Sequence, residues 1–198
     1  MVAITWIKAS GAEYASVQLG SLTDGDGWLR ATGVAVGAEP LPYQLDYSLN
    51  CGDGYVTRSL TVHTSGDGWS RALRLSRDPD GLWQVQADFA GAGDLPRPGA
   101  DPTSFAGALD CDLGLSPLTN TMPVLRHRLL AGGDPVDFLM AWVSVPDLAV
   151  HANVQRYTFL RPAGQGAVIN YSSGTFSADV TFDADGLVVD YPGLATRG

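Results

Sequence analysis

The sequence predicts a mainly β protein of the α+β class with a single helix, and three observations lead to this prediction. Gly (24 residues) and Pro (12 residues) are abundant in a chain of 198 residues of which 17% are charged, as is typical of turn-rich β proteins. Short segments of alternating apolar and polar residues recur with turn residues between them, which indicates half-buried strands. One segment has apolar residues at convincing helical spacing. A chain of this length can bury roughly 70% of its unfolded surface, and we expect residues 1–198 to form one domain.

The first half of the chain has the pattern of a meander. We expect strands that end at Gly37, Leu49, Val62, Arg77 and Phe89. Asp-Gly pairs lie between the strands, and an aromatic residue closely follows each pair. These turns are Gly25-Asp26-Gly27-Trp28, Gly52-Asp53-Gly54-Tyr55, Gly66-Asp67-Gly68-Trp69 and Asp80-Gly81-Leu82-Trp83. Asp-Gly suits the positive φ angles of tight hairpins, whereas an EF-hand calcium loop needs ligands at fixed alternate positions and a closing Glu, which these segments lack.

The second half begins with a stretch that has no periodicity. We interpret residues 91–103 as a long surface loop and not as a domain linker. Strands are expected again over residues 136–145, 148–160, 167–171, 175–182 and 187–189. Neither half offers an obvious complete core by itself, which favours a single domain.

The helix is expected near residues 121–130, after a short strand over residues 109–113. Its apolar side chains recur at helical spacing: Leu118, Met122, Leu125 and Leu129. Thr119 or Asn120 could cap it, and Pro123 is tolerated in the first turn. Gly132-Gly133 is the expected end of the helix.

Composition excludes several classes of function. The formal charge of −9 would repel nucleic acid and anionic membrane surfaces. The chain has no signal-peptide pattern at its start and no apolar run long enough to span a bilayer, so we expect a cytoplasmic protein without an integral membrane segment.

Cys51 and Cys111 are interpreted as free thiols. No histidine has metal-ligand spacing, and neither a phosphate loop nor a nucleophile elbow occurs, so we expect no metal and no cofactor.

The segment from Ala108 to Arg128 concentrates polar side chains and predicts a site. On a strand, Asp110 and Asp112 share one face, while Leu109, Cys111 and Leu113 share the other. Ionised carboxylates accept hydrogen bonds only, so they could hold the hydroxyl groups of a sugar. The alternative is that one acid pairs with Arg126 or Arg128 and the other is solvated. We weigh both interpretations equally for Asp112 and favour the second for Asp110.

Two further polar groups are candidates for the same site. Thr119, Asn120 and Thr121 precede the helix, whose free amides could hold a phosphate or sugar oxygen, although capping alone would explain them. On a later strand, Gln155 and Tyr157 share a face and Arg156 points the other way. Tyr157 could instead pack in the core with its hydroxyl bonded to the backbone.

Several separated motifs resemble those of the bacterial putative glycolipid-binding protein family, formerly a domain of unknown function. They are YSLNCGDGYVTRSL, LDCDLGLSPLTNTMPVLR, AWVSVPDLAV, the Gln155-Arg156-Tyr157-Thr158 tetrad and FDADGLVVDYPGL. The resemblance spans most of the chain, and Tyr55 stands where a tryptophan is usual. It implies a large curved antiparallel sheet wrapped around a single α-helix, remotely like lipoprotein-localisation factors, in a tight homodimer. It also implies an acidic pocket for a sugar or glycolipid, and it adds Glu13, Asp53, Arg58, Asp190 and Tyr191 as pocket or dimer residues.

The leading hypothesis is a non-enzymatic protein that binds a glycolipid or its sugar headgroup and acts in glycolipid metabolism. A first alternative is a glycoside or glycolipid hydrolase that uses Asp112 with Glu13 or Asp110, since paired carboxylates at suitable separation catalyse this reaction. A second alternative is a dimeric stress-response scaffold whose pocket is incidental. Asp53 and Asp190 could also serve only their turns.

Overall fold

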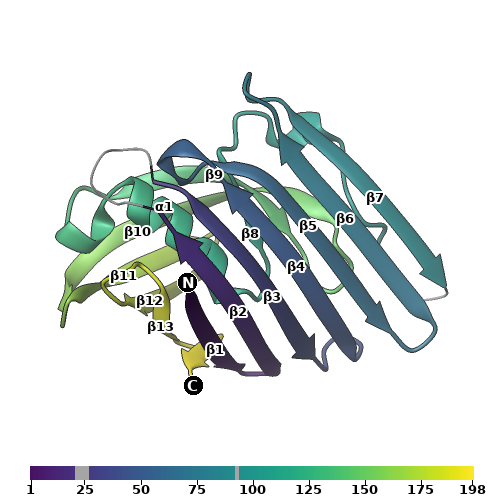
Figure 1. The fold of residues 1–198 in the computed structure, drawn as a ribbon, viewed down its shortest axis with the longest axis horizontal. Coiled ribbons are helices and arrows are strands. Elements are labelled where there is room, and N and C mark those ends of the chain that lie inside the picture. The colour runs from purple at the N-terminus through teal and green to yellow at the C-terminus, as the bar shows by residue number, and fades with distance from the viewer. Residues whose placement is uncertain (21–26, 92–93) are drawn as a thin grey trace.

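A computed structural model describes residues 1–20, 27–91 and 94–198, whose strands form one large curved sheet (Figure 1). The strands of the first half are β1 (Val2–Lys8), β2 (Gly11–Leu19), β3 (Leu29–Gly37), β4 (Tyr43–Cys51), β5 (Thr57–Gly66), β6 (Trp69–Arg77) and β7 (Trp83–Gly91). Those of the second half are β8 (Asp110–Leu113), β9 (Val136–Val143), β10 (Val150–Ala163), β11 (Gly166–Ser173), β12 (Phe176–Phe182), β13 (Val188–Tyr191) and β14 (Ala195–Arg197). The mainly β prediction is confirmed.

The order of the strands brings the two ends of the chain together. Across the sheet it is β7-β6-β5-β4-β3-β2-β1-β14-β13-β12-β11-β10-β9-β8. The first and last strands are therefore neighbours, and the Trp6 indole adds a hydrogen bond of 2.9 Å to the Val188 carbonyl. The expected antiparallel sheet needs one correction, because β8 pairs with β9 in parallel and the sheet is mixed. A parallel pair needs a crossover, and the helical segment provides it.

Alternation of apolar and polar residues predicted most of these strands, because inward-facing side chains are buried at every second position. In β3, for example, Leu29, Ala31, Gly33 and Ala35 are buried, and the residues that alternate with them are exposed. The sequence analysis did not predict β1, β2 or β14. The first of these has the same signal, since Ile4 and Trp6 face inward and the residues between and beside them face out.

The predicted Asp-Gly turns differ in form. Asp67-Gly68 makes a two-residue hairpin between β5 and β6, and Gly68 has the positive φ (72°) that this turn requires. The segment Asp53–Tyr55 is instead a short 3-10 turn, η1, with Gly54 at a φ of 66°. The turn at Gly25-Asp26 lies outside the described residues, as does part of the predicted loop over residues 91–103. The end of that loop enters another 3-10 turn, η2 (Pro102–Phe105).

The helix is shorter than predicted. The α-helix, α1, spans Thr121–Arg126, between the 3-10 turns η3 (Pro117–Asn120) and η4 (Leu129–Ala131). It stops before Gly132 because Arg128 adopts the left-handed conformation (φ 53°), which interrupts the helical hydrogen bonds. No side-chain cap forms at Asn120, because the chain is already helical through η3 when α1 begins.

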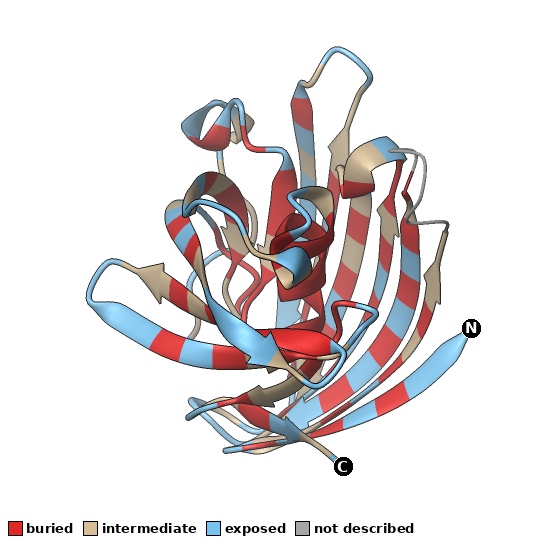
Figure 2. Ribbon diagram, turned by 90° about the vertical axis from the view of Figure 1, so that its left-hand side faces the viewer, coloured by how far each residue is buried: buried red, intermediate tan, exposed pale blue. Residues whose placement is uncertain are grey.

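The short helical segment lies in the hollow of the curved sheet and is buried on most sides (Figure 2). Met122 and Leu125 pack with the core of β1 to β7, whereas Val124 and Leu129 pack with the core of β9 to β13. Each fully buried apolar side chain contributes about 1.5–3 kcal/mol to folding. The apolar spacing therefore predicted the burial correctly even where the helix itself has ended. Along the described residues, no helix has the length and apolar character needed to span a membrane.

Candidate functional site

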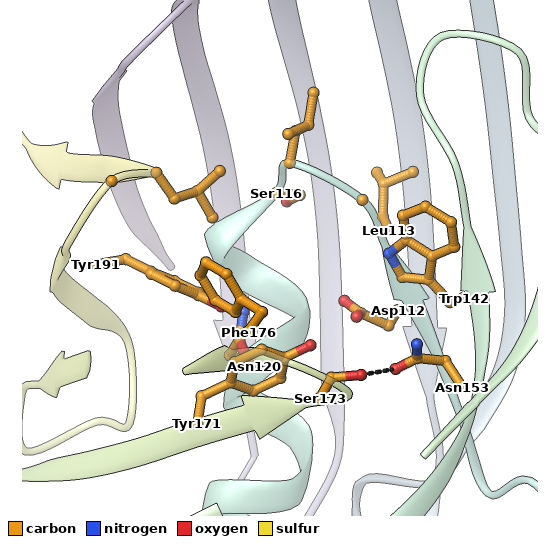
Figure 3. Close-up of a pocket in the computed structure, with 14 residues that line it drawn as sticks. Asp112, Leu113, Ser116, Asn120, Trp142, Asn153, Tyr171, Ser173, Phe176 and Tyr191 are labelled. Carbon is orange, nitrogen blue, oxygen red and sulfur yellow. Dashed lines mark hydrogen bonds between the residues drawn. The ribbon is translucent and has the colours of Figure 1, made fainter. Parts of the chain in front are cut away.

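A cavity of about 420 Å³ opens where β8, the β11–β12 hairpin and the end of β13 meet. Figure 3 shows its principal side chains, which come from segments far apart in the sequence. The lining residues are Asp112, Leu113, Gly114, Leu115, Ser116, Asn120, Trp142, Asn153, Tyr171, Ser173, Phe176, Tyr191, Gly193 and Leu194. Polar groups and aromatic rings thus share one surface, as in sites that bind small molecules.

Asp112 is the carboxylate of this cavity. Its Oδ1 accepts a hydrogen bond of 2.6 Å from the Thr119 hydroxyl, and its Oδ2 accepts one of 2.6 Å from the Gln155 amide. Burial raises the pKa of Asp112, and these two hydrogen bonds oppose the rise. A carboxylate can accept about four hydrogen bonds, so two acceptor positions remain after these contacts.

Gln155, Tyr157 and Asn120 form a second layer behind Asp112. The Tyr157 hydroxyl donates to Asn120 Oδ1 over 2.9 Å and lies 3.4 Å from Gln155 Oε1. The Asn120 amide nitrogen donates in turn to the Pro117 carbonyl over 3.2 Å. Tyr157 and Gln155 are completely buried, and burial raises the pKa of the Tyr157 phenol well above its usual value. This layer holds Asp112 in place, and only Asn120 of the three reaches the cavity surface.

The other walls of the cavity are aromatic. Tyr171, Phe176 and Tyr191 form a cluster with ring centroids 5.9–6.4 Å apart. Trp142 lies on the opposite side of Asp112 (Figure 3). Phe176 is about half-exposed at 49%, so its ring is available to a ligand. Faces of aromatic rings bind the apolar faces of ligands and also cations.

The two neighbouring acids of β8 have different environments. Asp110 is buried and forms an ion pair with Arg126, as the alternative interpretation expected. Asp112 differs from that interpretation, because Thr119 and Gln155 each donate a hydrogen bond to it. Burial raises the pKa of Asp110 against the opposing effect of Arg126. Leu109 is exposed, so the expected apolar face of this strand consists of Cys111 and Leu113.

Glu13 lies beside the cavity and does not line it. Its carboxylate accepts hydrogen bonds from Ser116 (2.6 Å) and Tyr47 (3.0 Å), and Lys8 Nζ lies 3.3 Å away. Burial raises the pKa of Glu13, while Lys8 opposes the rise. Ser116 lines the cavity, so Glu13 contributes to the site indirectly, by accepting the hydrogen bond that orients the Ser116 hydroxyl.

Three candidates lie apart from the cavity lining. The Asp53 and Arg58 side chains are exposed and pair loosely at 3.6 Å. Asp190 accepts a hydrogen bond of 2.9 Å from Thr196, whereas its neighbour Tyr191 does line the cavity. Asp53 therefore belongs to its turn, and Asp190 stabilises the pairing of β13 with β14.

The polar residues before the helix have different contacts in the structure. Because η3 runs directly into a helix of six residues, the amide of Thr121 already bonds to the Leu118 carbonyl. Thr119 instead contacts Asp112. Thr121 is fully buried, and its hydroxyl has no hydrogen-bond partner among the described residues.

The sequence interpretation missed several lining residues. Trp142 and Asn153 come from β9 and β10, and Tyr171, Ser173 and Phe176 come from the β11–β12 hairpin. The Ser173 hydroxyl donates to Asn153 Oδ1 over 2.9 Å (Figure 3). The segment Tyr171-Ser-Ser-Gly-Thr-Phe176 carries a signal, because two aromatic residues flank a polar turn. That signal does not indicate which other strands the turn will face.

Comparison with known proteins adds family information. A family model described as "Putative glycolipid-binding" matches residues 3–197. The crystal structure of a DUF1089 family protein from Pseudomonas aeruginosa is 30% identical in sequence and superposes with a TM-score of 0.66. That match covers 93% of this chain and 92% of the other. A search of curated proteins found no match.

Proposed function

Because this chain belongs to the putative glycolipid-binding family, we propose that it binds a glycolipid, with the sugar headgroup in the cavity at Asp112. The observation that carries the proposal is the position of Asp112 between aromatic walls, with acceptor capacity left over after its two hydrogen bonds. A polyol offers many hydroxyl donors and an apolar ring face, so it matches both features.

The lipid chain is accommodated by the apolar part of the same opening. Leu113, Leu115 and Leu194 line the cavity together with the exposed ring of Phe176. Their removal from water favours a hydrocarbon by roughly 25 cal/mol per Å² of apolar surface buried. The polar and apolar linings together therefore suit an amphipathic ligand.

We propose binding without turnover. Hydrolysis by paired acids needs two carboxyl groups at the scissile bond, roughly 5 to 9.5 Å apart. Asp112 is the one carboxylate among the described residues that line the cavity, because Asp110 pairs with Arg126 and Glu13 faces Lys8. Among the described residues, the geometry therefore gives the hydrolase alternative no specific support.

Native mass spectrometry with a panel of glycolipids and matching free sugars tests the proposal. We expect at least one glycolipid to bind with an unchanged mass after long incubation. Phe176→Ala should weaken that binding, whereas Phe89→Ala should not, since Phe89 is similarly exposed (44%) and lies on β7 outside the cavity. Failure of the whole panel to bind, while a control lectin binds its sugar, would overturn the proposal.

The homodimer implied by the family resemblance stays a prediction. Ile7, Tyr14, Val34 and Val36 are exposed apolar residues on the outer face of adjacent strands β1, β2 and β3, and this surface is the first to test. Sedimentation equilibrium should show a dimer that Val34→Asp dissociates.

A further inference from the structure

The cavity has an unusual charge balance. Asp112 is the one residue with a formal charge among its described lining residues, which contain no Lys, Arg or His. The basic side chain that approaches β8, Arg126, is paired with Asp110. Within the described part of the chain, no cationic side chain lies at salt-bridge distance from Asp112. The half-buried carboxylate therefore has no counter-ion of its own.

An uncompensated carboxylate of this kind favours a cationic ligand over an anionic one. Taking a carboxylate out of water is costly, and an opposite charge within about 4–6 Å recovers part of that cost. A phosphate or carboxylate headgroup would instead meet a like charge and no basic residue. The net charge of the whole chain, −9, also attracts cations and repels anions.

The aromatic walls of the cavity also favour a cationic ligand. Trp142 lies on one side of the Asp112 carboxylate, and the Tyr171, Phe176 and Tyr191 cluster lies on the other (Figure 3). The negative face of an aromatic ring attracts an ammonium group, and the attraction is largest where water is excluded. A neutral sugar would use the hydrogen bonds of Asp112 and the apolar ring faces, but it would leave the charge of the carboxylate unbalanced.

From this juxtaposition we propose that the headgroup bound at Asp112 carries a protonated amine, as in an amino sugar. The ammonium group would donate to the free acceptor positions of Asp112 and lie against the adjacent aromatic rings. This inference rests on the proposed glycolipid function, which it narrows to amine-bearing headgroups. Asp112 is the specificity-determining residue in this arrangement.

The test compares three lipids that share one acyl chain and differ only in the headgroup: glucosamine, N-acetylglucosamine or glucose. Isothermal titration near neutral pH should give an affinity for the glucosamine lipid about tenfold higher than for the other two, because acetylation and hydroxyl replacement both remove the charge. Asp112→Asn should abolish this preference, because the neutral amide offers no charge to the ammonium group, and the three lipids should then bind with similar, lower affinity. Asp137→Asn is the matched control, since Asp137 is an exposed carboxylate outside the cavity, and it should leave the preference unchanged.

A second variant keeps the test decisive if Asp112→Asn fails to fold. Phe176→Leu preserves an apolar wall at a half-exposed position and removes the aromatic face, so it should weaken binding of the glucosamine lipid more than binding of the glucosyl lipid and thereby reduce the preference for the amine. Equal affinity for the three lipids would overturn the amine inference and leave the glycolipid function standing. Absence of binding by all three would overturn both.

Discussion

The ion pair between Asp110 and Arg126 yields a stability prediction whose size follows from its burial. The side chains are 1% and 12% exposed, and the Arg126 Nε has no hydrogen-bond partner among the described residues. Asp110→Ala would leave the guanidinium buried without its carboxylate. Breaking a buried pair from one side costs about 3–5 kcal/mol. This loss is a large part of the roughly 5–15 kcal/mol by which proteins are usually stable.

Urea unfolding at neutral pH, followed by tryptophan fluorescence, measures this loss. The control is Asp137→Ala, which removes the exposed pair between Asp137 and Arg156 (54% and 55% exposed) and should cost no more than about 1 kcal/mol. Replacing both buried partners, as in Asp110→Leu with Arg126→Met, should recover much of the stability, since no unpaired charge remains. Our reasoning is refuted if the two Ala variants differ in free energy of unfolding by less than about 1 kcal/mol.

Three further predictions concern titration, reactivity and packing. Burial raises the pKa of Asp112, so the folded protein keeps the proton of the Asp112 carboxyl group to a higher pH than the unfolded chain does. The free energy of unfolding therefore falls as pH rises from about 4. Asp112→Asn should reduce that fall in urea titrations at several pH values, and an unchanged pH dependence would contradict this. Burial raises the pKa of Cys111 to about 12 and that of Cys51 well above its usual value, so both thiols should resist a thiol reagent until the protein is unfolded; rapid labelling of the native protein would show otherwise. Gly33→Ala places a Cβ 2.4 Å from the ring of Tyr47, and thermal unfolding should reveal a loss of about 1–3 kcal/mol, whereas an unchanged midpoint would argue against this steric clash.

The strands show how much of the fold is encoded locally. Strands β3, β4 and β6 alternate regularly in burial, because side chains on a strand point to opposite faces in turn. The helix illustrates the limit of this signal. Apolar spacing correctly predicted that Leu118, Met122, Leu125 and Leu129 are buried, but not that the helix ends at Arg126. The end depends on the left-handed conformation of Arg128, and apolar spacing carries no information about it.

The sequence indicated Asp112, Asn120, Gln155 and Tyr157 as candidates, and in the structure hydrogen bonds connect their side chains. Gln155 and Tyr157 lie behind the cavity lining. The sequence did not distinguish the roles of Asp110 and Asp112, which share a strand face and a residue type. Their difference arises because Arg126 reaches one acid and Thr119 with Gln155 reaches the other. The sequence analysis also missed the aromatic residues Tyr171 and Phe176, because the side chains that they face across the cavity lie on other strands.

By itself, the sequence determined the mainly β class, most of the strand-forming segments and, on the strands with regular alternation, the face on which the side chains lie. These properties depend on neighbours within a few residues, whose polarity and spacing can be read directly. Only the tertiary structure decided which acid faces the cavity, which acid forms an ion pair and which aromatic rings line the cavity. Asp112 and its partner Gln155 are 43 positions apart, and the contact between them exists only after the sheet has brought β8 beside β9 and β10 beside β9. The chemistry of the site is therefore a property of strand order, which no local pattern specifies.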